Sequence, residues 1–241
     1  MNIKIAKAFR TTSSEAVCIL AGTTPIIIRM EEAVKQYFLR KGKGTLTQSV
    51  GLEVEPKNWS HPAEVAEFTV GKEYGNETIQ INTDGSRNEQ GVGAEVAMFS
   101  GNELVTTLKY RLDNRCSNSQ AEQLAIAKAL EALEKTDIEK NSPRTAAIIT
   151  DSKISLDSIK DMNNHSYLIE EIRERLSKLV RSSWKVMFVW VKAHAGILGN
   201  ELADQLAKTA ARDEDMTTSF CRIPLSTLLR ELEEESKLKW Q

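Results

Sequence analysis

Hydrophobic and polar residues alternate in several short stretches of the last two thirds of the chain, and apolar residues recur at helical spacing between them. The clearest alternation covers residues 78–84, where Ile79, Ile81 and Thr83 share one face. A period of two predicts a β-strand, and the acid Asp84 closes it before a glycine. A carboxylate at a strand end is both reachable by solvent and rigidly held, so this stretch is the first candidate site.

The remaining pattern predicts elements in the order βββαβααβα. The strands are expected at 77–84, 92–99, 104–112, 146–149 and 185–191. The helices are expected at 119–133, 154–162, 168–179 and 200–211. Ser119 is the expected N-cap of the first of these helices, because Glu122 follows it three residues later in capping-box spacing.

Turn signals between the first three strands predict an antiparallel meander. The continuous apolar run at 146–149 is typical of a strand buried on both faces among parallel neighbours. Right-handed crossovers then place the first strand between the second, which is antiparallel, and the fourth, which is parallel. The expected fold class is α/β, with a five-stranded mixed sheet of three antiparallel and then two parallel strands, flanked by helices.

Three parts are expected along the chain. They are a small helical N-terminal appendage at 1–75, an α/β domain at 76–212 and a charged C-terminal tail at 213–241. The appendage is expected to hold helices at 13–20 and 30–39, and the tail an amphipathic helix from Leu225 onward. The basic stretch 40–43 is interpreted as a solvated surface, with a nucleic-acid contact as the alternative.

Composition narrows the class of protein. The formal net charge of −2 gives no bulk basic signal for nucleic acid, but a carboxylate cluster that holds cations carries local negative charge. The cysteines Cys18, Cys116 and Cys221 are odd in number and far apart, which favours an intracellular protein without disulfides. No apolar run reaches the ~20 residues that cross a bilayer and no signal peptide is recognised, so no membrane association is expected.

Four acids stand at the ends of predicted elements. Asp84 and Asp151 close two parallel strands, so both carboxylates are expected at one sheet edge. Glu122 and Asp204, each about one turn into a helix, are expected to lean over that edge. Converging carboxylates repel one another unless cations neutralise them, and oxygen ligands select hard ions such as Mg²⁺, with Mn²⁺ as a substitute. His194, in a glycine-bearing loop, is placed to move protons.

Each of these residues also has a simpler structural interpretation. Asp84 fits a turn, Glu122 the acid-favouring first turn of a helix, and Asp151 a helix N-cap. Asp204 fits a solvated helix acid, and His194 an ordinary loop residue. Their joint placement at element ends favours a site for two cations, which could stabilise the attacking and leaving oxygens of a phosphodiester displacement.

Four motifs, in this order, resemble the type 1 ribonuclease H family. They are Thr83-Asp84-Gly85-Ser86, Asn118-Ser119-Gln120-Ala121-Glu122, Thr150-Asp151-Ser152 and the run from His194 to Asp204. The resemblance covers roughly residues 77–212 and implies a ribonuclease H-like fold. It also implies endonucleolytic cleavage of the RNA strand of RNA/DNA hybrids, leaving 5′-phosphate and 3′-hydroxyl ends.

The same resemblance implies roles for individual residues. Two Mg²⁺ ions would be held by Asp84, Glu122, Asp151 and Asp204. His194 would assist proton transfer or product release. Substrate contacts, which include recognition of the RNA 2′-hydroxyl, would come from Gly85, Ser86, Asn118, Ser119 and Asn200.

A second resemblance concerns the N-terminal part. Residues 10–15, 21–22, Pro25 and 26–29 resemble the segment that follows the polymerase in non-LTR retrotransposon polyproteins of animals. This resemblance implies a reverse transcriptase domain, outside this sequence, as a partner beside the RNA/DNA hybrid. The region 154–180 lacks the basic, tryptophan-rich protrusion of bacterial members of the family, which is consistent with a substrate held by such a partner.

Two rival functions are considered. One is a catalytically silent remnant that binds nucleic acid or a protein partner, against which the intact set of acids argues. The other is a different nuclease or an integrase on the same fold. The position of Glu122 between the first two aspartates, and of His194 ten residues before Asp204, argues against that alternative.

Overall fold

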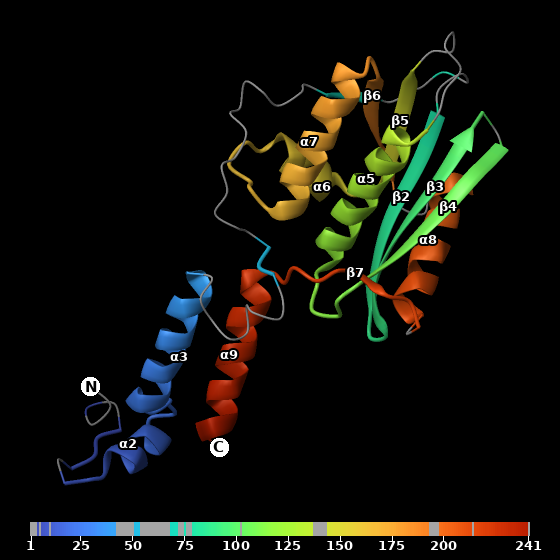
Figure 1. The fold of residues 1–241 in the computed structure, drawn as a ribbon. Coiled ribbons are helices and arrows are strands. Elements are labelled where there is room, and N and C mark those ends of the chain that lie inside the picture. Colours follow the sequence, from blue (N-terminus) through green and yellow to red (C-terminus); the bar gives the residue numbers. More distant parts are fainter. Residues whose placement is uncertain are drawn as a thin grey trace. The chain divides into compact units, whose positions relative to one another are not determined.

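The structure is a computed structural model that describes most of the chain. The described residues are 4, 6–9, 11–41, 51–53, 68–71, 75, 79–101, 103–136, 144–192, 198–213 and 215–240. The chain divides into two compact units, one of Met1–Leu52 with Ile223–Gln241 and the other of Glu53–Arg222. The larger unit carries a sheet and the smaller unit is helical (Figure 1).

The larger unit is built on a seven-stranded sheet in the order β1-β6-β5-β2-β3-β4-β7 (Figure 1). The strands are β1 (Thr69–Gly71), β2 (Ile79–Asn88), β3 (Gly91–Ser100), β4 (Glu103–Leu112), β5 (Thr145–Thr150), β6 (Lys185–Trp190) and β7 (Thr218–Phe220). β3 runs antiparallel to both β2 and β4, whereas β5 and β6 run parallel to β2. This arrangement confirms the predicted α/β mixed sheet and the order of its five central strands.

Two details of the predicted sheet are wrong. The sheet has seven strands instead of five, because β1 adds to β6 and β7 to β4, and a three-residue strand is too short to show a period of two. In addition, β2 does not stop at Asp84 but continues to Asn88. β3 pairs with β2 as far as Gly91, whereas the parallel pairing with β5 ends at Thr83 and Thr150.

Helices cover both faces of the sheet. They are α5 (Asn118–Glu134), α6 (Lys153–Lys160), α7 (Tyr167–Arg181) and α8 (Leu198–Arg212). The first three lie on one face and α8 on the other (Figure 1). The main core lies under the first three helices and includes Ile81, Val96, Ile126, Leu130 and Phe188. On the opposite face Gly93 lets α8 come close, since a Cβ there would lie 2.5 Å from the Ala207 carbonyl oxygen.

The N-terminus of α5 is closed by a capping box two residues earlier than predicted. Ser117 Oγ accepts from the Gln120 backbone N–H at 3.2 Å, and Gln120 Oε1 accepts from the Ser117 N–H at 2.9 Å. The predicted cap at Ser119 is therefore wrong, and Ser119 lies inside the first turn. Because Gln120 supplies the reciprocal bond, the Glu122 carboxylate is not used for capping.

The connection between α6 and α7 is held by one buried guanidinium. Arg173, only 2% exposed, donates to the backbone carbonyls of Ile159, Asp161 and Asn164 at 3.1, 2.7 and 2.7 Å. Its charge is balanced by Glu170, whose carboxylate lies 2.8 Å away. Arg173 thus satisfies a carbonyl of the last turn of α6, which a helix leaves without an intrahelical partner, and two carbonyls of the connection that follows.

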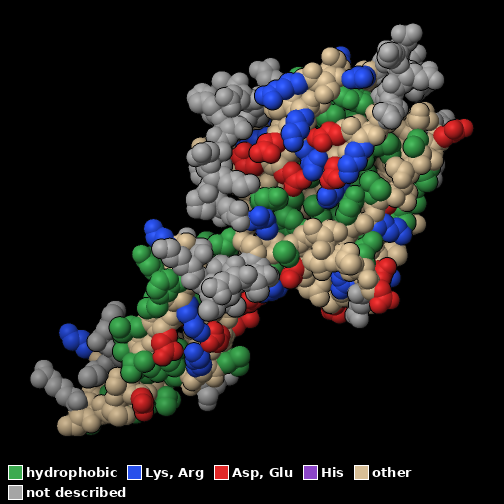
Figure 2. Space-filling view, viewed as in Figure 1, with side chains coloured by type: hydrophobic (Ala, Val, Ile, Leu, Met, Phe, Trp, Pro, Cys, Tyr) green, Lys and Arg blue, Asp and Glu red, His purple; other side chains and the backbone are tan. Residues whose placement is uncertain are grey.

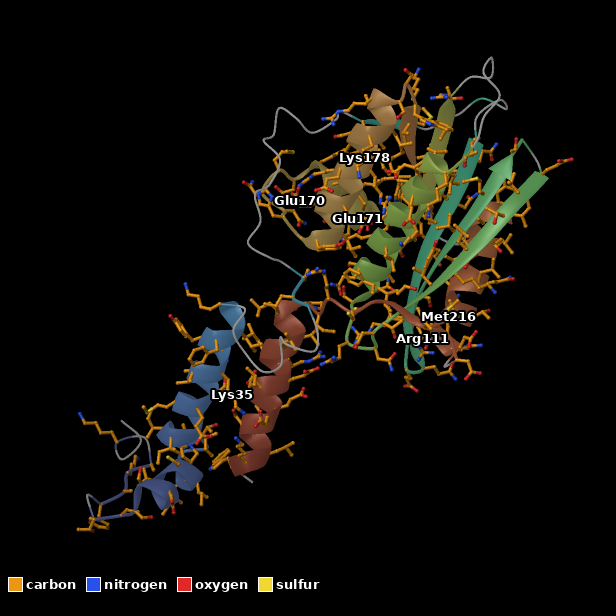
Figure 3. The ribbon with its side chains drawn as sticks, viewed as in Figure 1. Lys35, Arg111, Glu170, Glu171, Lys178 and Met216 are labelled. Atoms are coloured by element: carbon orange, nitrogen blue, oxygen red, sulfur yellow. The ribbon has the colours of Figure 1, made fainter. Side chains whose placement is uncertain are left out.

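The smaller unit contains α2 (Ser14–Leu20), α3 (Ile26–Arg40) and α9 (Leu225–Trp240). α9 corresponds to the amphipathic helix that was expected from Leu225. Ion pairs join α3 to α9, with Lys35 Nζ 2.7 Å from Glu235 and Lys239 Nζ 3.4 Å from Glu31 (Lys35 is labelled in Figure 3). The N- and C-terminal helices therefore belong to one unit. None of the helices in the described part of the chain combines the length and apolarity that a membrane span requires.

Candidate active site

Two of the predicted acids are brought together by strand register. Thr83 of β2 pairs with Thr150 of β5, and Asp84 and Asp151 each follow one residue later. The strands are parallel and their last shared pair is Thr83 with Thr150. The two acids that follow this pair therefore lie at the same edge of the sheet. Asp151 is not the N-cap of α6, since Ser152 Oγ accepts from the Ser155 N–H, so the simpler interpretation of Asp151 is wrong.

The third acid reaches this edge because a glycine allows it. A Cβ on Gly85 would lie 2.4 Å from the Glu122 backbone nitrogen, 2.7 Å from the Ala121 carbonyl carbon and 2.9 Å from the Ala121 Cβ. Distances this short exclude any side chain at this position without movement of β2 or α5. Gly85 therefore sets how closely the first turn of α5, and with it Glu122, approaches Asp84.

Asp84, Glu122 and Asp151 form a compact cluster of oxygen ligands. Each offers a carboxylate oxygen, and these oxygens lie within 4.8 Å of one another. Asp84 and Glu122 are 5% and 6% exposed, and Glu122 Oε2 has no hydrogen-bond partner among the described residues. Three carboxylates with a buried, unpartnered oxygen fit a hard divalent cation, because leaving such an oxygen unpaired is costly.

The electrostatics of the cluster reflect this crowding. Burial raises the pKa of the Asp84 carboxyl to about 7, and the charges of Asp151 and Asp204 add to the rise. Burial also raises the pKa of Glu122 well above its usual value, with further contributions from Asp84 and Asp151. A hydrogen bond from the Gly85 amide opposes both shifts. A bound cation would remove the repulsion that keeps these pKa values high.

The fourth acid stands apart from this group. Asp204 lies on α8, and its Oδ2 accepts from Lys208 Nζ at 2.7 Å, four residues further along the helix. Its charge is nevertheless close enough to raise the pKa of Asp84 and Glu122. The structure thus places Asp204 beside the cluster, with a lysine as its present partner.

The other predicted site residues are placed as follows. Asn118 is the exposed first residue of α5 and Ser119 the partly buried second, while Ser86 follows Gly85 on β2. His194 and the Asn200 side chain lie outside the described part of the structure. The assigned roles of these residues in substrate contact and proton transfer stay predictions.

Sequence reasoning missed several residues that lie beside the cluster acids in space or in strand register. Trp190, at the end of β6, donates from its indole N–H to the Asp151 backbone carbonyl at 3.0 Å. Thr150 Oγ1 accepts from the Ser152 N–H at 3.1 Å and so helps to shape the same turn. On β3, Glu95 lies opposite Asp84 in register and is fully buried. The one available signal was its position, an acid in an otherwise apolar strand segment.

Comparisons with known proteins agree with this geometry. The model of the RNase H family matches residues 76–212. The chain is 33% identical to the ribonuclease H of Maricaulis maris over 147 residues, which cover 54% of this chain and 91% of that protein. It is 31% identical to the ribonuclease H of Novosphingobium aromaticivorans over 146 residues, 55% of this chain and 96% of that protein. It is also 40% identical over 68 residues to a retrovirus-related Pol polyprotein from the type-1 retrotransposable element R1 4 of Nasonia vitripennis, covering 27% of this chain and 17% of that protein.

Proposed function

Because the chain belongs to the RNase H family, we propose that it cleaves the RNA strand of RNA/DNA hybrids endonucleolytically, leaving 5′-phosphate and 3′-hydroxyl ends. The observation that carries the proposal is the cluster of Asp84, Glu122 and Asp151, of which the first two are buried, with its unpartnered Glu122 oxygen. Burial and the charges of neighbouring acids raise the pKa of both Asp84 and Glu122, and a bound cation would relieve that repulsion.

In this proposal Asp84, Glu122 and Asp151 hold a divalent cation, Mg²⁺ with Mn²⁺ as a substitute, and Asp204 contributes to a second ion. Cations in such a site activate water and stabilise the attacking and leaving oxygens of the phosphodiester. The chain itself positions the carboxylates through strand register and through the close contact at Gly85. His194 is assigned the movement of a proton as product leaves.

The substrate would be recognised beside the first turn of α5. Asn118 and Ser119 lie there, and the backbone of Gly85 and Ser86 passes next to it. Amide and hydroxyl groups at this place suit hydrogen bonds to the 2′-hydroxyl, which distinguishes RNA from DNA. We assign these residues to the RNA strand.

The distribution of surface charge favours a partner domain that helps to bind the hybrid. Figure 2 shows Lys and Arg side chains interleaved with Asp and Glu over the face that includes α5 and α7. Arg175 on α7 pairs with Glu131, Glu134 and Glu171, so its charge is already compensated. Neutralised basic groups contribute little to phosphate binding. We therefore propose that a reverse transcriptase domain outside this sequence contributes affinity for the hybrid.

The proposal is tested by cleavage of matched RNA/DNA, RNA/RNA and DNA/DNA duplexes in Mg²⁺. The native chain should cut only the RNA strand of the hybrid, and Asp84→Asn should abolish cutting. Asp157→Asn, at an exposed acid of α6, is the matched control and should cut normally. If the native chain binds hybrid but cuts nothing in Mg²⁺ or Mn²⁺ at enzyme excess, the catalytically silent remnant becomes the better description.

A further inference from the structure

The residues after 212 lie beyond the match to the family model, yet residues up to 222 are built into the larger unit. β7 extends the sheet at β4, with Arg111 opposite Thr218 and Leu112 opposite Phe220. The Arg111 guanidinium donates to the Asp213 carbonyl (Arg111 and Met216 are labelled in Figure 3). Phe220 is 8% exposed, so this segment is packed and not merely laid along the surface.

At its end this segment contacts the start of α5. The Arg222 carbonyl accepts from Gln120 Nε2 at 2.9 Å and from Cys116 Sγ at 3.8 Å. Gln120 is 1% exposed and Cys116 is fully buried, so both donors lie in the interior of the unit. The Arg222 guanidinium in turn lies 3.9 Å from the ring centre of Tyr167 on α7, which fixes the segment from a second side.

The side-chain amide of Gln120 links the N-terminal cap of α5 to the segment that ends at Arg222. Its Oε1 completes the capping box with Ser117, and its Nε2 reaches the Arg222 carbonyl. Glu122 is only two residues further along the same helical turn, and its backbone nitrogen is the atom that a Cβ on Gly85 would approach most closely. Any shift of this turn relative to β2 therefore moves a ligand of the carboxylate cluster.

We propose that the segment Thr218–Arg222 supports the active site, and that Gln120 is the positioning residue through which it holds Glu122 against β2. This inference rests on the proposed function, because the cluster is taken as a cation site. It assigns a role to a segment outside the family match. It also explains why a buried glutamine occupies this position: a side chain with both an acceptor and a donor is needed to join the cap and the segment.

The test uses the full chain with Gln120→Met, which removes both ends of the bridge without adding charge, and Phe220→Ala, which loosens the segment and leaves the capping box intact. Binding of Mn²⁺ is measured by calorimetry, and amide exchange is followed at residues 121–125. Each variant should weaken Mn²⁺ binding by about tenfold, the lower end for side chains that orient metal ligands. Each should also speed exchange in the first turn of α5. Val105→Ala, at an exposed residue of β4, is the control and should change neither.

The double variant separates this role from general destabilisation. If both residues act through one segment, Gln120→Met with Phe220→Ala should bind Mn²⁺ no more weakly than the weaker-binding single variant. Fully additive losses, or unchanged Mn²⁺ binding and exchange in folded Gln120→Met or in folded Phe220→Ala, would overturn the proposal. If the native chain itself binds no Mn²⁺, the proposed function fails, and exchange at 121–125 still decides whether the segment supports α5. Should Phe220→Ala not fold, Phe220→Leu, which trims the same side chain less and also leaves the capping box intact, takes its place.

Discussion

Replacing Gly85 with alanine adds one carbon atom at the point where β2 meets α5. The new Cβ would lie 2.4 Å from the Glu122 nitrogen and 2.7 Å from the Ala121 carbonyl carbon, whereas ordinary contacts begin at 3.4 Å. Both atoms belong to the helix backbone and cannot rotate away as the end of a long side chain would. The helix or the strand must therefore move by about 1 Å, since close-packed interiors have no room to absorb the clash.

This displacement has two measurable costs. Overpacking of this kind lowers the free energy of unfolding by about 1–3 kcal/mol. A reacting group misplaced by about 1 Å lowers the rate of catalysis by about 100-fold. Gly85→Ala should thus lose cleavage as well as stability, and the roughly 100-fold rate loss corresponds to about 2.7 kcal/mol, because the helix that moves carries Glu122.

The assay compares urea unfolding with the single-turnover rate of hybrid cleavage. Gly101→Ala is the matched control, because Gly101 has a φ of +59° but no atom within 4 Å of an added Cβ. Its strain should cost about 1 kcal/mol of unfolding free energy and leave cleavage unchanged. A Gly85→Ala variant with native stability and a native cleavage rate would refute the view that this contact positions the site.

Four further substitutions have defined outcomes. Burial raises the pKa of Glu95 to about 8, with Lys109 opposing the shift, whereas the pKa in the unfolded chain is near 4.5. Between these two pH values the unfolded chain gives up the proton more readily than the native protein, so the free energy of unfolding falls as the pH rises. Glu95→Gln should therefore raise the unfolding free energy by about 1–3 kcal/mol at pH 8 and leave it unchanged at pH 4, as measured by urea unfolding at both pH values. Arg173→Lys should cost about 3 kcal/mol in the same assay, since an ammonium group cannot reach the carbonyls that the guanidinium bridges; a native midpoint would contradict this. Ser117→Ala should cost about 1 kcal/mol and Ser119→Ala much less, and the reverse order would restore the predicted cap.

The sequence was sufficient to predict the strands and helices in which apolar residues recur with a regular period. The strands that became β2 to β6 and the helices between them show periods of two and about 3.6, and parallel crossovers then define which strand ends share an edge. The proximity of Asp84 and Asp151 follows from that rule alone. β1 and β7 were missed because their positions depend on tertiary pairing and not on a local pattern.

Contacts between residues far apart in the chain could not be predicted from such local patterns. The roles of Gly85 and Arg173 depend on atoms far along the chain, namely the start of α5 and the end of α6. A lysine four residues after Asp204 was visible in the sequence, and helical spacing makes such a pair expected. The spacing did not predict, however, that Asp204 would lie beside the carboxylate cluster, paired with Lys208, while the other three acids form the cluster.

The capping box at the start of α5 shows why a local ambiguity in the sequence matters for the site. Ser117 with Gln120 has the same spacing as the predicted pair of Ser119 with Glu122, so the spacing used for the prediction does not separate them. A cap at Ser119 would use the Glu122 carboxylate to accept a backbone N–H, and the helix would begin about 3 Å further along its axis. The observed cap at Ser117 assigns that task to Gln120, whose oxygen is neutral, and leaves Glu122 Oε2 buried without a partner among the described residues. The choice of cap therefore determines whether the acid closes its own helix or remains available to the carboxylate cluster.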